Sequence, residues 1–197
     1  MRCAGLQRPR SIDKPEPTRT DGPMIVNQSE IHLRDIAIGD AGWLIQRHGE
    51  LYAADEGFDA SFEVLVAEIL VDFLRNRDPE TERGWIAATG KQRLGSIFCV
   101  HSGDPGVAKL RLFFVEPDAR GLGLGRRLLE VCIAFARDTG NYTLRLWTHE
   151  SHRAACALYA AYGFRCVASR PVHSFGVDLI EQTWELDLTL AIVPNQR

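Results

Sequence analysis

The residues with the clearest chemical potential form a glycine-rich loop after a short apolar strand. The strand must end at Pro117, because proline has no amide hydrogen to give to a neighbouring strand. Gly121, Gly123 and Gly125 follow, and apolar residues then recur at helical spacing at Leu124, Leu128, Val131, Cys132 and Phe135. Glycines at a helix start let a ligand approach backbone amides that lack intrahelical partners. The pattern predicts an anion site where a helix begins near Gly123.

Positive charge strengthens this prediction. Arg120, Arg126 and Arg127 lie beside the loop, and the dipole of the helix favours an anion at the same end, so a pyrophosphate is the expected ligand. The spacing is not the Gly-x-Gly-x-x-Gly of dinucleotide-binding loops, and no Gly-Lys-Ser/Thr follows as a nucleotide hydrolase requires. What remains is Arg120-x-x-Gly123-x-Gly125 directly after a strand and a Val-x-Pro turn.

This loop resembles the cofactor signature of the GNAT superfamily of N-acetyltransferases, Arg/Gln-x-x-Gly-x-Gly/Ala. A second motif of that family, Asn-x-x-Ala-x-x-Leu-Tyr followed by Gly-Phe, matches residues 152–159 and Gly163-Phe164. His152 departs from the motif, since many members have asparagine there. The resemblance covers roughly residues 30 to 190 and implies acetyl-CoA as the cosubstrate.

The resemblance also implies which residues bind the cosubstrate. Its pantetheine amides would pair with the backbone of Phe113, Phe114 and Val115, and their side chains would pack in the core. The pyrophosphate would bind at Arg120, Gly121, Leu122, Gly123, Leu124, Gly125 and Arg126. His152 would contact the pantetheine arm with an imidazole hydrogen bond. Tyr159 would protonate the coenzyme A thiolate as it leaves.

Transfer to an amine also requires a proton acceptor, because an ammonium ion has no free electron pair. The candidates are Glu50, Asp55 and Glu56, in the segment where members of the family form the acceptor pocket; Glu116 is another, although its place beside Pro117 suggests a turn. Each could equally belong to a solvated acidic face. Together they favour a cationic acceptor, a small molecule or a peptide.

Two histidines raise the question of a metal. His149 and His152 are three residues apart, but they do not form His-Glu-x-x-His, and no third ligand is evident. We therefore predict no metal site.

Residues 48–59 and 182–186 are similar to a subgroup of GNAT domains often fused behind a MarR-type winged helix. Since no winged helix is present here, we expect the enzyme module alone. A non-catalytic module that senses acyl-CoA is the alternative function. The sequence is also compatible with a homodimer formed through one of the last strands.

Composition narrows the class of protein. The 197 residues suit one domain, and a net charge of −3 argues against a nucleic-acid partner. No apolar run is long enough to span a bilayer, so we expect no membrane partner. The five cysteines form no Cys-x-x-Cys pair, which favours a reducing cytoplasm. Four of them lie in apolar patterns and are expected to be buried: Cys99, Cys132, Cys156 and Cys166.

The order of elements is similar to that of the GNAT fold, and this resemblance implies an α+β (α/β/α) architecture. A mixed, mostly antiparallel sheet of about seven strands would be flanked by four helices in the order β-α-α-β-β-β-α-β-α-β-β. The helices are expected at 40–52, 62–74, from Gly123 to near Gly140, and 152–162, with Asp40 and Ser151 as N-caps. The strands are expected at 31–36, 85–88, 94–101, 107–116, 142–148, 164–173 and 179–190.

The domain would span 29–190 and end in a tail, 191–197. The proline-containing, basic residues 1–28 are expected to be a disordered extension, with Met24 as an alternative start.

Overall fold

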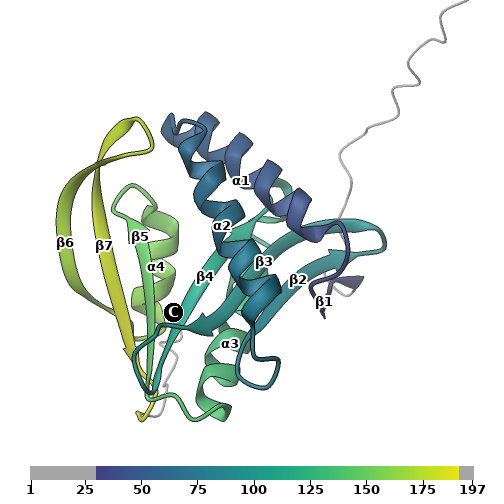
Figure 1. Cartoon of the computed structure of the whole chain (residues 1–197), viewed down its shortest axis with the longest axis vertical. Helices are drawn as coiled ribbons and strands as arrows, with labels where there is room; N and C mark the ends of the chain where they lie inside the picture. Colours follow the sequence, from purple (N-terminus) through teal and green to yellow (C-terminus); the bar gives the residue numbers. More distant parts are fainter. Residues whose placement is uncertain (1–29, 191–197) are drawn as a thin grey trace, which may run out of the picture.

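The computed structural model describes residues 30–190, so the predictions made for 1–28 and 191–197 lie outside the described residues. Over this range the chain forms seven strands and four α-helices (Figure 1). The strands are β1 His32–Asp35, β2 Arg83–Thr89, β3 Gln92–His101, β4 Val107–Val115, β5 Thr143–His149, β6 Arg165–Ser174 and β7 Val177–Asp187. The helices are α1 Asp40–Glu56, α2 Ser61–Asn76, α3 Leu124–Asp138 and α4 Arg153–Ala161, with a 3₁₀ turn η2 at Pro117–Ala119.

The strands form one sheet in the order β1-β2-β3-β4-β5-β7-β6. All neighbours are antiparallel except β4 and β5, which run parallel because α3 carries the chain across between them. This confirms the predicted mixed, mostly antiparallel sheet and the predicted order of elements. Turn residues after β2 and β3 make the expected antiparallel meander, which leads into β4.

Two apolar cores lie on opposite faces of the sheet. Strands β2 and β3 are buried on both faces, so alternate residues contribute to different cores. Trp85 and Cys99 pack toward α3 and α4, whereas Ile86 and Phe98 pack toward α1 and α2. The result is a three-layer arrangement with α1 and α2 on one face (Figure 1).

The structure corrects both predicted helix caps. Asp40 is the first residue of α1 rather than its cap, and Gly39 occupies the cap position. The Asp40 side chain is fully buried, where Arg34, Arg93 and the Ala37 amide all donate to it. His152 rather than Ser151 occupies the cap position of α4, and its side chain makes no capping bond.

The structure also corrects one expected burial, since Cys166 is exposed. It lies on β6, one of the two edge strands of the sheet, where almost every side chain faces solvent. Cys99 and Cys132 are buried as expected, and Cys156 is partly buried.

Among the helices of residues 30–190, none combines the length and the apolar character needed to cross a lipid bilayer.

Candidate active site

Strands β4 and β5 separate after a short paired stretch. They pair only between residues 107–109 of β4 and 143–145 of β5. Beyond this stretch β4 is bulged: its register with β3 shifts, and Leu112 has a φ of 45°. The Ser96 hydroxyl donates to the Leu112 carbonyl over 2.6 Å and stabilises the bulge. The two strands therefore diverge into an opening in the sheet (Figure 1).

Backbone groups of β4 remain available along this opening. Phe114 and Val115 pair with β3 on one side, whereas β5 pairs with β7 through His149 and does not return to β4. Peptide groups on the open side need hydrogen-bond partners from outside the sheet. An extended ligand that carries amides, such as a pantetheine arm, would supply them.

The glycine loop lies at the end of β4 and leads into α3. Gly121 and Gly123 have φ values of 77° and 71°, which glycine adopts without strain. A Cβ added at either would meet nothing within 4 Å. The amide of Arg127 donates to the Gly123 carbonyl and begins the helical pattern, so the amides of residues 124–126 have no intrahelical acceptor. Three glycine-loop amides at an open helix start fit a pyrophosphate.

Gly125 lies where three elements meet. A Cβ added there would lie 3.6 Å from the Phe113 ring on β4 and 3.6 Å from Leu158 on α4. The glycine loop, the open strand and α4 are thus adjacent, as the two sequence motifs together require.

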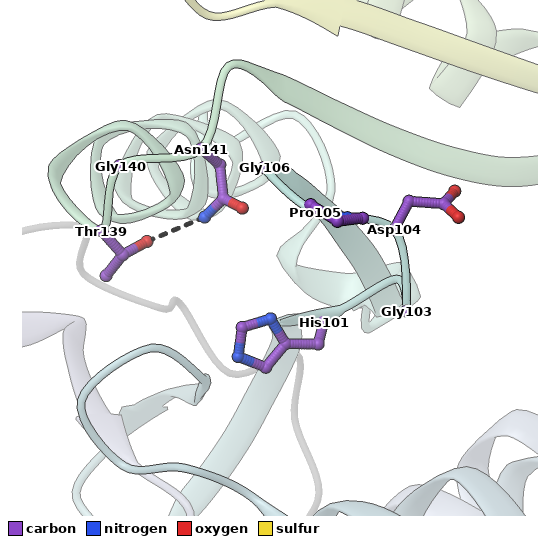
Figure 2. Close-up of a pocket in the computed structure, with 8 residues that line it drawn as sticks. All are labelled: His101, Gly103, Asp104, Pro105, Gly106, Thr139, Gly140 and Asn141. Carbon is purple, nitrogen blue, oxygen red and sulfur yellow. Dashed lines mark hydrogen bonds between the residues drawn. The ribbon is translucent and has the colours of Figure 1, made fainter.

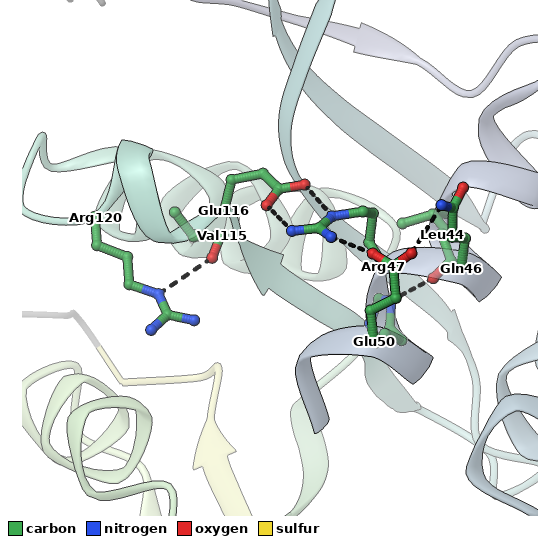
Figure 3. Close-up of polar contacts among 8 residues, drawn as sticks. Leu44, Gln46, Arg47, Glu50, Val115, Glu116 and Arg120 are labelled. Carbon is green, nitrogen blue, oxygen red and sulfur yellow. Dashed lines mark hydrogen bonds and ion pairs between the residues drawn. The ribbon is translucent and has the colours of Figure 1, made fainter. Parts of the chain in front are cut away.

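A network around Arg47 connects α1 to the end of β4 (Figure 3). Arg47 donates two bonds of 2.8 Å to the Glu116 carboxylate and also binds Glu50. The bond to Glu116 raises the pKa of Arg47 further above its usual value. Arg120 donates to the Val115 carbonyl over 3.3 Å. Of the predicted proton acceptors, Glu50 and Glu116 therefore share one guanidinium.

Tyr159 lies on α4 beside the open part of β4. Its side chain is buried, and its ring centroid is 6.1 Å from that of Phe113. Burial raises the pKa of Tyr159, an effect to which nearby Tyr52 adds, so the hydroxyl keeps its proton at all physiological pH values. The neighbouring Tyr162 instead donates its hydroxyl to Glu130.

Aromatic side chains gather on the α1 and α2 face, next to the opening. Their rings approach one another at centroid distances from 4.5 to 6.2 Å. We call this group the ring cluster; it comprises Tyr52, Phe58, Phe62, His149, His152 and Phe175. The amide of Asp59 donates to the Phe175 carbonyl over 2.9 Å and ties the α1–α2 connection to the β6–β7 turn.

Ring contacts also cross the opening from β4. Phe114 lies 5.1 Å from His48 on α1, His48 stacks 6.0 Å from Tyr52, and Tyr52 lies 5.2 Å from His152 at the start of α4. Helix α1 thus links β4 to the start of α4 through ring contacts. Burial, with a smaller contribution from Glu56, raises the pKa of Tyr52 to about 12.

His152 meets one of the predicted proton acceptors. Its Nε2 atom is 3.5 Å from Glu56 Oε1, and its Nδ1 atom is 3.2 Å from the Thr148 hydroxyl. Burial lowers the pKa of His152, although Glu56 and Asp55 act in the opposite direction. The structure therefore places Glu56 with His152, but it places Glu50 with Arg47.

Sequence reasoning considered His149 only as a metal ligand and overlooked its surroundings. In the part of the chain that the structure describes, no three His, Cys, Asp or Glu side chains gather to hold a metal ion. His149 is 1% exposed and belongs to the ring cluster. The alternation of Arg145, Trp147 and His149 on one strand face was the available signal, but Phe58 and Phe175 come from distant connections.

A separate cavity of about 380 Å³ lies at the other end of β4 (Figure 2). It is open to solvent and lies between the β3–β4 turn and the α3–β5 turn, and the residues that line it are His101, Gly103, Asp104, Pro105, Gly106, Thr139, Gly140 and Asn141. These residues lie at the start of β4, whereas the glycine loop follows its end. This cavity is therefore distinct from the opening and its glycine loop.

Comparison with known proteins agrees with this geometry. Residues 47–164 match the family model described as Acetyltransferase (GNAT) family. The chain belongs to the GNAT acetyltransferase family. This confirms the family resemblance and the fold class.

Individual relatives are similar over limited lengths. The mycothiol acetyltransferase of Geodermatophilus obscurus is 39% identical over 85 residues, which are 41% of this chain and 28% of that protein. The chain thus spans little more than a quarter of that relative.

Solved structures match the fold more completely. The ribosomal-protein-alanine N-acetyltransferase of Brucella melitensis is 21% identical with a TM-score of 0.65, over 79% of this chain and 99% of that one. YncA of Salmonella typhimurium, solved with its cofactor acetyl-CoA, is 21% identical with a TM-score of 0.61, over 84% and 98%.

Proposed function

We propose that this GNAT enzyme transfers an acetyl group from acetyl-CoA to a primary amine by direct attack. The observation that supports this most strongly is the unpaired edge of β4 beside a glycine loop with free helix-start amides. Acetyl-CoA supplies the thioester carbonyl carbon that the amine attacks. Amides of residues 121–126 hold its pyrophosphate, and the backbone of Phe113, Phe114 and Val115 pairs with its pantetheine arm.

Residues around the opening would assist the reaction. An amide near Val115 polarises the thioester carbonyl, since a fixed donor there stabilises the charge that develops on oxygen. Tyr159 gives its proton to the departing sulfur, since its hydroxyl is protonated at neutral pH. His152 contacts the pantetheine arm from the start of α4.

The acceptor in this proposal is a cationic small molecule or peptide. Three acidic residues lie at the end of α1 and in the connection to α2, namely Asp55, Glu56 and Asp59. Glu56 is the side chain among them that reaches the start of α4. Carboxylates at the entrance to the ring cluster would attract an amine in its charged form before it loses a proton.

Acetyl-CoA binding tests the cosubstrate site. Gly123→Glu places negative charge and bulk at the pyrophosphate position, and Gly140→Glu is its matched control. Both glycines are exposed residues with positive φ at opposite ends of α3, and a Cβ at either meets nothing within 4 Å. By calorimetry we expect Gly123→Glu to weaken binding about 100-fold or more, because like charges in contact cost several kcal/mol. Equal losses in both variants would contradict the proposed site.

Turnover separates an enzyme from an acyl-CoA sensor. The full chain is mixed with acetyl-CoA and with spermidine, an alanyl peptide or propylamine, and release of the coenzyme A thiol is followed. We expect release with an amine and a loss of about 100-fold or more in Tyr159→Phe with binding retained. Binding without release for any amine would favour the sensor.

A further inference from the structure

The side chain of His149 is buried without any hydrogen-bond partner among the described residues. Among the buried side-chain nitrogen and oxygen atoms of residues 30–190, those that lack a hydrogen-bond partner are the two ring nitrogens of His149. A buried polar group left without a partner destabilises the fold, because it has given up its hydrogen bonds to water. Such a group in a native fold calls for an explanation, and an external hydrogen-bond partner is one.

The surroundings of His149 are almost entirely apolar. Trp147 lies 4.4 Å away by ring centroids, and rings from the α1–α2 connection and the β6–β7 turn cover it. The titratable groups that face it are His152 from α4, at 5.1 Å, and Glu181 from β7, its partner in the sheet register. Neither donates a hydrogen bond to it or accepts one from it.

This environment sets the protonation state of the ring. Burial, and secondly the neighbouring His152, lower the pKa of His149 to about 4, against the smaller influence of Glu181. The imidazole is therefore uncharged near neutral pH and offers one nitrogen with a free electron pair. A histidine with an ordinary pKa would lose part of this capacity as the pH falls toward 6.

The carboxylates considered from sequence are less suited to the task. Arg47 binds both Glu50 and Glu116, so neither has an unpaired carboxylate. Glu56 lies beyond His152, at its Nε2 atom. His149 belongs to the ring cluster, and neither of its ring nitrogens has a hydrogen-bond partner there.

We propose that His149 accepts a hydrogen bond from the acceptor amine and takes its proton as the amide forms. This inference rests on the proposed acetyl transfer and names the proton acceptor for it. The amine enters uncharged; its nitrogen forms a bond to the acetyl carbon, and the bond from that carbon to sulfur breaks. The proton leaves the nitrogen for the imidazole of His149, and the sulfur receives a proton from Tyr159.

The proton on His149 then returns to solvent as the product leaves, since the neutral ring is the stable form near neutral pH. His152 lies beside His149 without a hydrogen bond to it, and His152 in turn meets Glu56, whose side chain is 22% exposed to solvent.

Turnover of two variants tests the proposal. His149→Phe keeps the ring packing, and His149→Asn keeps hydrogen-bonding groups but has no basic nitrogen. The amine is trifluoroethylamine, whose ammonium form is far more acidic than that of an alkylamine, so it stays neutral at pH 7. We expect both variants to bind acetyl-CoA like the parent and to release coenzyme A about 100-fold more slowly or worse. Retention of activity within tenfold in His149→Asn would overturn the role as proton acceptor.

A binding measurement by NMR, which needs no turnover, provides a second test of the role of His149. Ring nitrogen signals of His149, assigned by their absence in His149→Phe, are followed by NMR at pH 7 while trifluoroethylamine, which is neutral at that pH, is added in the presence of coenzyme A. We expect one ring nitrogen of His149 to shift, because accepting a hydrogen bond alters it. Shifts confined to His152 would overturn the inference. If the parent binds no acetyl-CoA, the proposed function itself fails, and this inference fails with it.

Discussion

Asp40 and His149 are both almost completely buried, but their surroundings are opposite. Asp40 is 0% exposed and His149 is 1% exposed. Two guanidiniums and a backbone amide donate to Asp40, whereas nothing within the described residues bonds to the ring of His149. The first lies at the start of α1 among β1 and β3 side chains, and the second lies at the end of β5.

The contrast separates a structural polar group from one that is available to a ligand. Burial alone would raise the pKa of Asp40, but bonds from Arg34, Ala37 and Arg93 outweigh it and lower the pKa. For His149, burial is the dominant influence and no bond opposes it. A buried charge whose hydrogen bonds are all made holds elements together. A buried neutral group without hydrogen-bond partners can still bond to a ligand.

The largest effect on stability is expected at Asp40. Asp40→Ala leaves Arg34 and Arg93 without their shared partner and should lower the free energy of unfolding by about 3 kcal/mol. Asp35→Ala is the control, because Asp35 pairs with Arg83 at an exposed site, 59% and 45% accessible. Its loss should stay below about 1 kcal/mol. Urea denaturation measures both, and equal losses would contradict the structural role of Asp40.

His48 is an intermediate case and should make the fold sensitive to acid. It is 3% exposed, and one ring nitrogen bonds the Leu44 carbonyl. Burial lowers its pKa to about 4 from 6.5, so its neutral form stabilises the fold above pH 6.5 and this contribution is lost as the pH falls toward 4. Between pH 7 and 4.5 the loss amounts to about 2 kcal/mol.

The variant His48→Phe isolates this contribution, since phenylalanine fits among Phe62 and Phe114. Its urea denaturation should lose about 2 kcal/mol less than the parent between pH 7 and 4.5. A loss of the same size in both proteins would assign the acid sensitivity to other groups.

The smallest effect is expected at His149, and it has the opposite sign. His149→Phe removes two unsatisfied nitrogens from an apolar environment and should raise the free energy of unfolding at pH 7 by about 1 kcal/mol. Thermal and urea denaturation give the value. A clear destabilisation would mean that the ring has a structural partner, and the contrast with Asp40 would no longer hold.

Much of the site follows from local sequence. Strand β4, the proline turn, the glycine loop and α3 are consecutive, so their residue types and spacing predicted them together. Tyr159 and His152 were also predicted as site residues, because a second short motif carries them. The boundaries of α1 and β7 differ from those expected by a few residues, since helix and strand ends depend on packing as well as on pattern.

Other features could not be predicted from local patterns. Asp40 fits the pattern of an N-cap, but its partners Arg34 and Arg93 come from β1 and β3, and pairing with them buries the carboxylate. Glu50 fits an acceptor site by its position, but Arg47 binds it together with Glu116 from the end of β4.

The sequence by itself determined the family, the order of the elements and the position of the glycine loop at the start of α3, because these depend on residues that are close along the chain. Only the tertiary structure decided that β4 and β5 diverge and that His149 is left without a partner. Those features arise where α1, β5, α4 and the β6–β7 turn meet. Burial and hydrogen bonding depend on which elements pack together in space, and no short stretch of sequence contains that information.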